Sequence, residues 1–483
     1  MWDVKWYKDA LLVNRDVDWT IQALNGDSRE EMLENIRQYF LKFTGHKITD
    51  FLLNIFEQIS FIPSEKMDWI GAKYAMRDEY DETMPYYIVL EKLHKCYVEY
   101  GIDPVAEAFD IMKKNGIRPW ITFRMNDAHY AAECENSLQK MQIFYEEEKA
   151  GHLLGDEYGY FKCGYNFSYP KIREAFLGMF EEVLDKYDMF GLELDFQREI
   201  FCFDYKNDPD CHKIMTEFIR QVKEKITAAE KKHGHKICLM IRTAHSAEDA
   251  LGFGFDIKTM CDEGLIDAVN PTARWEYTDS GIPVREWKEI CGENVALFPG
   301  IETLNLEFTR TSSEQSKAYS ASFYAQGADG IYFNNHQSGS PNDIKVWNIT
   351  HDNCTDGRRE FTVTKQDICS GKAERYMPLP MSADGTLLLE LGKIKADDKV
   401  TLIADFEGDT IPILSVCGKE ALKPEITAAH IVASEDKNKE DVNMTPHTPL
   451  SYDLSGIETE STITLTFGGV GTIHYITIII ESK

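Results

Sequence analysis

Short apolar runs that favour β-strands alternate with amphipathic helical stretches from about residue 17 to residue 336. This alternation is typical of a parallel sheet covered by helices. The candidate strands cover residues 17–23, 48–58, 118–127, 190–196, 236–243, 267–272, 296–303 and 330–336. Eight strands are the number that a closed barrel needs, so the pattern predicts an α/β fold of the TIM (β/α)8 barrel type.

Capping residues and prolines mark where the intervening helices begin. Ser28 and Glu31 have capping-box spacing at the start of a helix predicted over residues 28–43. Pro104, Pro170 and Pro209 stand at or near the starts of helices predicted over residues 104–115, 170–187 and 209–233, and another helix is predicted over 313–326. The long connections at about 59–103 and 128–169 are expected to shape a substrate site.

The helical period disappears after about residue 355, and short alternating runs take over. They cover residues 360–365, 386–391, 399–405, 410–416, 430–433, 462–467 and 472–480. Turn signals such as Glu407-Gly408-Asp409 and Gly468-Gly469 separate them. We therefore predict a barrel domain over residues 1–355 and a C-terminal antiparallel β-sandwich domain over residues 356–483.

The net charge of the chain limits the classes of partner that it is expected to bind. Lys and Arg number 52 against 81 Asp and Glu, a formal charge of −29, so we expect neither nucleic acid nor a membrane as a partner. No stretch approaches the roughly 20 apolar residues of a membrane-spanning helix, and the N-terminus does not resemble a secretory signal. The 11 cysteines have irregular spacing and no Cys-x-x-Cys pair, which favours reduced thiols in a cytoplasmic protein. The oligomeric state stays open.

Polar residues end all the predicted barrel strands, which a purely structural interpretation does not readily explain. Strand ends cluster at one face of a barrel, where such enzymes keep their reacting groups. The residues in strand order are Gln22; Glu57; Arg124, Asn126 and Asp127; Glu193, Asp195, Arg198 and Glu199; Arg242 and His245; Asn270 and Arg274; Glu302; Asn334, Asn335 and His336.

Two acids lie two residues apart in the apolar strand over 190–196. Each buried carboxylate costs several kcal/mol to desolvate unless it is paired, so Glu193 and Asp195 indicate a site. Glycoside hydrolysis uses two carboxyl groups, and we favour Asp195 as general acid/base with Glu302 as nucleophile or second base. Glu193 would tune Asp195 or pair with Arg124 or Arg242, and a buried ion pair without a catalytic role is equally open. Glu199 is a rival for the acid.

Arginines also gather at the strand ends. They either balance the clustered acids or bind an anionic substrate group such as that of a uronic acid. The expected substrate-binding residues are Arg124, Asn126, Asp127, Arg198, Glu199, Arg242, Asn270, Arg274, Trp275 and Asn335. Trp19, Trp275, Tyr277 and Phe333 could stack on a sugar ring or pack in the core. His129, His245 and His336 lack close ligand spacing, so we expect no metal and no cofactor.

Three runs resemble a known group. They are Trp120-Ile-Thr-Phe-Arg-Met-Asn-Asp-Ala-His129, Gly191-Leu-Glu-Leu-Asp-Phe-Gln-Arg198 and Phe298-Pro-Gly-Ile-Glu302. They resemble bacterial glycoside-hydrolase-like (β/α)8-barrel proteins, which often carry a β-sandwich tail, and the similarity spans most of residues 17–340. The resemblance implies a carbohydrate-active barrel with acids on its fourth and seventh strands, matching Asp195 and Glu302. Retaining hydrolases of this kind usually end the fourth strand with Asn-Glu, where this chain has Leu194-Asp195.

The sequence thus predicts a glycosidase that cleaves a small saccharide or glycoside, neutral or acidic. One alternative is a metal-dependent sugar isomerase, epimerase or lyase on the same barrel, which a chelator would inactivate. Another is a non-catalytic carbohydrate-binding barrel, whose binding would survive loss of the acids. The fold alone does not decide among them.

Overall fold

The computed structural model describes residues 6–80, 82, 87–127, 140–273, 278–305, 309–336, 338–364, 379–419, 422–427 and 448–482. One sheet of nine strands has the order β7-β6-β5-β4-β3-β2-β1-β11-β8, and a separate seven-stranded sheet lies toward the C-terminus. The chain divides into two compact units. The first is Met1–Trp6, Leu12–Pro271 and Ile290–Leu297, and the second is Tyr7–Leu11, Thr272–Glu289 and Phe298–Lys483. A domain boundary at residue 355 stays a prediction.

The strands of the first unit are parallel and buried. They are β1 (Ala10–Arg15, whose first two residues fall in the second unit), β2 (Asp50–Glu57), β3 (Arg118–Arg124), β4 (Gly191–Asp195), β5 (Cys238–Thr243), β6 (Ala268–Pro271) and β7 (Ala296–Leu297). Strands buried on both faces read as nearly continuous apolar runs, which is why the sequence located β2 to β6.

The first predicted strand, over residues 17–23, is wrong. The strand lies earlier, at β1, and residues Trp19–Ala23 form helix α1. Trp19, Thr20 and Ala23 are the buried residues of α1, and this is a helical spacing rather than the alternation of a strand. Gln22 consequently lies exposed on a helix and not at a strand end.

The helices of the first unit after α1 are α2 (Arg29–Leu41), α3 (Tyr87–His94), α4 (Pro104–Lys114), α5 (Gln142–Ala150), α6 (Pro170–Lys186), α7 (Cys211–His233), α8 (Ala247–Gly252) and α9 (Ile257–Asp262). Four of them, α2, α4, α6 and α7, match predicted segments, and α3, α5, α8 and α9 were not predicted. Ser28 caps α2 by accepting a hydrogen bond from the backbone N–H of Glu31 at 3.2 Å. The long connections contain α3, α5, the 3₁₀ segments Ile70–Glu79 and Asp156–Cys163, and the π turn Lys95–Glu99.

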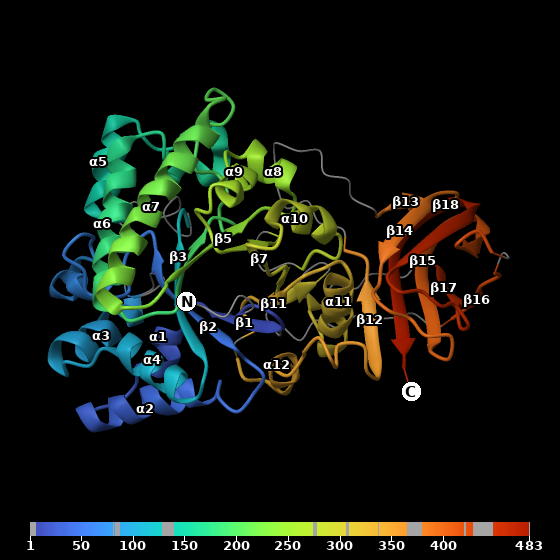
Figure 1. Ribbon diagram of the computed structural model, residues 1–483, viewed down its shortest axis with the longest axis horizontal. Coiled ribbons are helices and arrows are strands. Elements are labelled where there is room, and N and C mark those ends of the chain that lie inside the picture. The colour runs from blue at the N-terminus through green and yellow to red at the C-terminus, as the bar shows by residue number, and fades with distance from the viewer. Residues whose placement is uncertain are drawn as a thin grey trace. The chain divides into compact units, whose positions relative to one another are not determined.

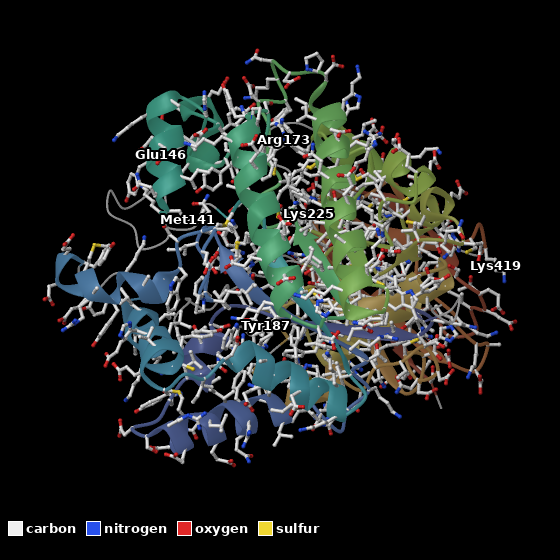
Figure 2. All side chains as sticks on the ribbon, turned by 60° about the vertical axis from the view of Figure 1, so that its left-hand side comes forward. Met141, Glu146, Arg173, Tyr187, Lys225 and Lys419 are labelled. Atoms are coloured by element: carbon white, nitrogen blue, oxygen red, sulfur yellow. The ribbon has the colours of Figure 1, made fainter. Side chains whose placement is uncertain are left out.

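Helices α6 and α7 lie side by side (Figures 1 and 2). An ion pair joins them on their exposed side, where Lys225 of α7 donates to Glu181 of α6 at 2.8 Å. At the C-terminal end of α6 the hydroxyl of Tyr187 donates to Asp103, the N-cap of α4, at 2.9 Å. These contacts fix the helices that follow β3 and β4 without involving the strand ends.

The second unit contains the remaining parallel strands, β8 (Gly300–Ile301) and β11 (Gly330–Phe333), which pair with each other. It also contains β9 (Leu304–Asn305), β10 (Thr309–Arg310), α11 (Ser313–Ala325) and α12 (Pro341–Val346), while α10 (Val284–Cys291) crosses the division between the units. The predicted strand over 296–303 is thus two short strands. Pro299, which has no N–H to donate, lies in the two-residue break between them.

The seven-stranded antiparallel sheet has the order β12-β18-β15-β17-β16, with β13 and β14 also paired to β18 (Figure 1). Its strands are β12 (Arg358–Thr362), β13 (Met381–Ser382), β14 (Thr386–Glu390), β15 (Lys399–Val416), β16 (Glu425–Ile426), β17 (Thr448–Asp453) and β18 (Thr462–Glu481). The all-β character is confirmed, but the breaks predicted at 406–409 and 468–471 are wrong. The run predicted at 430–433 lies outside the described residues.

Each of those breaks lies inside one continuous strand. The glycines permit a close approach of β15 and β18, which pair with register shifts near Gly408. A Cβ atom on Gly471 would lie 2.3 Å from the carbonyl oxygen of Glu407. The glycines therefore serve strand contact here and not chain reversal.

Candidate functional site

Five polar residues occupy one level of the parallel sheet. Glu57, Arg124, Asp195, Arg242 and Asn270 are successive register partners on β2, β3, β4, β5 and β6. Register partners in a parallel sheet point to the same face, so their side chains form one line, which we call the polar row. The row lies at the carboxyl ends of the strands and is buried. All five were noted as polar residues at predicted strand ends, and all but Glu57 were chosen as site residues.

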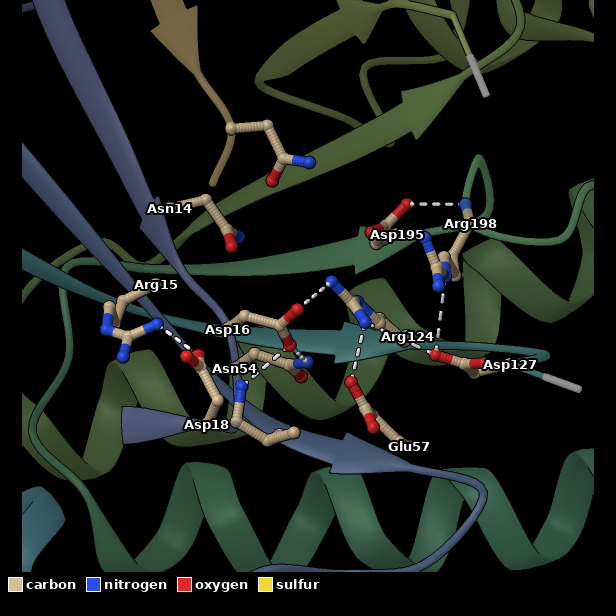
Figure 3. A network of polar contacts seen from close by, with 12 residues as sticks. Asn14, Arg15, Asp16, Asp18, Asn54, Glu57, Arg124, Asp127, Asp195 and Arg198 are labelled. Carbon is tan, nitrogen blue, oxygen red and sulfur yellow. Dashed lines mark hydrogen bonds and ion pairs between the residues drawn. The ribbon is translucent and has the colours of Figure 1, made fainter. Parts of the chain in front are cut away.

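Arg124 is the centre of an ion-pair network (Figure 3). Its guanidinium group donates to Glu57 at 2.6 Å, to Asp16 at 2.8 Å and to Asp127 at 3.3 Å. Only 4% of the Arg124 side chain is exposed. Asp16 follows the end of β1, so acids from three separate parts of the sequence contact this single guanidinium group.

The surroundings shift the pKa values of Glu57 and Asp16 in opposite directions. Burial and the nearby Asp16 and Asp127 carboxylates raise the pKa of Glu57 well above its ordinary value. Arg124 holds the pKa of Asp16 below its usual range, against the effect of burial, and Asp16 also accepts a hydrogen bond from Glu57. Such opposite shifts of the two pKa values are expected when two acids occupy one site.

Asp195 has a different set of partners. Its carboxylate forms an ion pair with Arg242 at 2.7 Å and accepts the backbone N–H groups of Gln197 at 2.9 Å and Arg198 at 3.2 Å. The Arg198 side chain turns toward Asp127 at 3.7 Å, as Figure 3 shows. A cation and two N–H donors together stabilise negative charge on Asp195.

The predicted arginines therefore contact acids of the chain itself. Within the described residues, three guanidinium groups meet four carboxyl groups: Arg124, Arg198 and Arg242 against Asp16, Glu57, Asp127 and Asp195. These contacts are those expected if the three arginines balance clustered acids, and recognition of an anionic group by them stays a prediction.

Glu193 lies two residues before Asp195 on β4, on the same face of the strand, and is fully buried. Its carboxylate accepts hydrogen bonds from the hydroxyl of Thr122 at 2.6 Å and the side-chain amide of Asn14 at 3.3 Å. The sequence suggested Arg124 or Arg242 as its partner. Thr122 and Asn14 are both neutral donors, and Glu193 lies opposite Thr122 on β3.

Asn126 holds two loops together. Its side chain donates to the carbonyl oxygens of Tyr165 and Phe201, at 3.1 Å and 2.7 Å, and accepts the N–H of Tyr165 at 2.8 Å. The carboxamide that was predicted to bind substrate is therefore used within the chain. Glu199 is buried, and its role as a rival acid stays a prediction.

Glu302 belongs to the second unit, where it follows β8. Its side chain is fully buried and accepts hydrogen bonds from Thr272 at 2.9 Å and Asn334 at 2.7 Å. A ring nitrogen of His336 lies 3.1 Å from the backbone carbonyl of Glu302. Asn335, which lies between Asn334 and His336 in the sequence, is buried and has a left-handed φ of 57°. The carboxyl group of Glu302 is thus fixed by uncharged donors.

Several predicted residues contribute to the core or lie beyond the described part of the chain. Trp19 is buried and donates from its indole N–H to the carbonyl of Asn54 at 3.0 Å, and Phe333 is fully buried in β11. These two rings pack in the core and offer no exposed face to a sugar. Arg274, Trp275, Tyr277 and His129 lie outside the described residues.

Sequence reasoning missed Asp16 because it misplaced the first strand. The run Ala10–Arg15 is apolar and then turns polar at Asn14, Arg15 and Asp16, which is the same strand-end signal that identified Asp195. Glu57 carried that signal too but was not chosen as a site residue.

The described residues include no cluster of three or more His, Cys, Asp or Glu side chains that could hold a metal ion. In the same part of the chain, no helix has the length and apolarity to cross a membrane.

Comparisons with known proteins give likeness of fold at low identity. No family model matches the chain, and no curated protein matches it. Among solved structures it is similar to alpha-L-fucosidase isoenzyme 2 from Paenibacillus thiaminolyticus, at 12% identity and a TM-score of 0.42 over 71% of this chain and 48% of that one. A putative alpha-L-fucosidase from Bacteroides thetaiotaomicron is similar at 10% identity and a TM-score of 0.36, over 99% and 96% of the two chains.

A family GH18 chitinase from Chromobacterium violaceum is similar at 8% identity and a TM-score of 0.39, over 99% of this chain and 89% of that one. The chain spans about half the length of the Paenibacillus fucosidase. These structural neighbours are glycoside hydrolases. What the present chain does has to be argued from its own residues.

Proposed function

We propose that the protein is a glycoside hydrolase that acts on a small saccharide or glycoside with Asp195 and Glu302 as its two carboxyl groups. The observation that carries the proposal is the polar row at the carboxyl ends of β2 to β6. Parallel α/β sheets keep their reacting groups at that end. We also propose that the sheet closes as a (β/α)8 barrel, since its end strands β7 and β8 are joined by Phe298 and Pro299 alone.

The contacts of the two acids suggest separate roles. Asp195, bound by Arg242 and two N–H groups, is suited to act as nucleophile or as a stabiliser of positive charge on the sugar. Glu302, held by Thr272 and Asn334, is suited to give a proton to the leaving group. This reverses the assignment that the sequence favoured. Glu302 joins Asp195 in the proposal on the sequence argument that strand ends share a face.

The test is turnover of aryl glycosides by the purified full chain and by the Asp195→Asn and Glu302→Gln variants, with and without EDTA. Loss of the acid slows substrates with poor leaving groups far more than dinitrophenyl glycosides, so Glu302→Gln is expected to retain the latter activity. Asp195→Asn is expected to lose both. Hydrolysis that survives in both variants would refute the assignment, and activity that EDTA abolishes would favour the metal-dependent alternative.

A further inference from the structure

Two carboxamide side chains near Asp195 are completely buried and lack partners. Gln197 and Asn270 are both 0% exposed. For each, neither the side-chain nitrogen nor the oxygen has a hydrogen-bond partner among the described residues. A buried donor or acceptor left unpaired costs about 1–3 kcal/mol, and native proteins satisfy the large majority of them. Within the described residues, these four atoms beyond β4 and on β6 leave hydrogen-bonding capacity for a group outside the chain.

Both carboxamides border the same salt bridge. Asn270 on β6 is the register partner of Arg242 on β5, which in turn is the register partner of Asp195 on β4. Gln197 lies two residues beyond Asp195 and donates its backbone N–H to that carboxylate at 2.9 Å. Adjacent strands lie about 4.8 Å apart, so the two side chains begin on strands separated by about 10 Å.

The charges of this region favour a neutral ligand. Arg242 already neutralises Asp195 at 2.7 Å, and Arg198 faces Asp127. An anionic ligand would have to compete with these buried carboxylates for the guanidinium groups. A carboxamide presents two N–H donors and one acceptor oxygen, whereas a sugar hydroxyl both donates and accepts. Carboxamides therefore match the hydroxyl groups of an uncharged sugar.

We propose that Gln197 and Asn270 form a subsite for a neutral sugar unit, each carboxamide binding ring hydroxyls beside Asp195. The inference rests on the proposed glycosidase function and deepens it by naming the substrate class. It decides between the neutral and acidic saccharides that the sequence left open. It also adds Gln197 to the substrate-binding residues, while Asn270 keeps the role predicted for it.

The test measures binding of neutral pentoses, hexoses and 6-deoxyhexoses, and of the matching uronic acids, by calorimetry on the full chain. The variants are Gln197→Met and Asn270→Leu, which keep the side-chain volume and remove the polar atoms. We expect a neutral sugar to bind and each variant to weaken it at least about tenfold. Without sugar, the thermal midpoint of the variants is expected to stay the same or rise, because an unpaired buried group has been removed.

Gln58→Met is the matched control. Gln58 is also 0% exposed with both side-chain atoms unpartnered in the described structure, but it follows β2 rather than β4 or β6. Its substitution is expected to leave sugar binding unchanged. Tighter binding of uronic acids than of neutral sugars, no binding of any neutral sugar, or full binding in both site variants would each overturn the inference.

The two proposals fail in different ways. If no glycoside is hydrolysed but neutral sugar binding is lost in Gln197→Met and Asn270→Leu, the subsite stands and the glycosidase function falls. If glycosides are hydrolysed and both variants keep the wild-type KM and sugar affinity, the function stands and the subsite falls. Asp195→Asn is expected to remove hydrolysis while sugar binding remains measurable.

Discussion

Replacing Glu57 by glutamine tests the shared proton of the site directly. The pKa of Glu57 is raised well above its ordinary value of 4.5 by burial and by Asp16 and Asp127. The folded chain therefore holds a proton on Glu57 that the unfolded chain releases above about pH 4.5. The stability that Glu57 contributes is complete below that pH and is lost as the pH rises through the folded-state pKa.

The size of the effect follows from linkage. Between the two pKa values the folded state binds one more proton, so Glu57 lowers the free energy of unfolding by about 1.4 kcal/mol for each pH unit of increase. Glutamine at position 57 can still accept from Arg124 and donate to Asp16, but it cannot ionise. The stability of the variant relative to the wild type is expected to rise by about that slope above pH 5 and to level off at the folded-state pKa.

The assay is urea unfolding followed by tryptophan fluorescence from pH 5 to pH 9. Buried Trp19 and Trp120 report on the first unit. A difference between variant and wild type that does not change with pH would refute the reasoning, because it would mean that Glu57 is already ionised in the folded protein.

A double-mutant cycle supplies the control. Asp16→Asn is expected to be tolerated, because loss of the Asp16 charge lowers the pKa of Glu57 and lets Glu57 ionise in its place. In the double variant, Glu57→Gln with Asp16→Asn, neither side chain can ionise. The buried guanidinium charge of Arg124 is then left unbalanced, which lowers the free energy of unfolding by about 3–5 kcal/mol. Additive effects of the two substitutions would contradict the shared-proton arrangement.

Other contacts give sharp expectations. Arg242→Met leaves the buried Asp195 carboxylate without its cation and is expected to lower the free energy of unfolding by about 3–5 kcal/mol, measured in urea, whereas the same change at exposed Arg220 is expected to cost under about 1 kcal/mol. Gly471→Ala places a Cβ 2.3 Å from a backbone carbonyl of the paired strand and is expected to lower the thermal midpoint, while Gly468→Ala, with its nearest contact at 3.4 Å, is expected to have little effect. Ser312→Ala removes the capping box of α11 and is expected to cost about 1 kcal/mol in urea unfolding, and Ser312→Asp is expected to restore most of it; equal stability of both would contradict the capping role.

The sequence by itself determined the β/α alternation and most of its elements. Strands β2 to β6 are continuous apolar runs, and α2, α4, α6, α7 and α11 carry apolar periodicity and capping signals within one short stretch of chain. Strand ends also identified Arg124, Asp195, Arg242 and Asn270 of the polar row. All of these features depend on residues that are close together in the sequence, so the sequence alone is enough to predict them.

Only the tertiary structure decided which charges meet. Asp16 follows β1, Glu57 ends β2 and Arg124 ends β3, and Arg124 is 108 residues from Asp16. Whether a buried acid holds a proton depends on its desolvation and on the distance to each neighbouring charge, and neither is encoded locally. The same holds for Gln197 and Asn270, because whether a carboxamide has a partner among the described residues depends on the elements packed around it. The sequence could identify the polar residues of the site, and the packing of distant strands set their protonation and their unpaired groups.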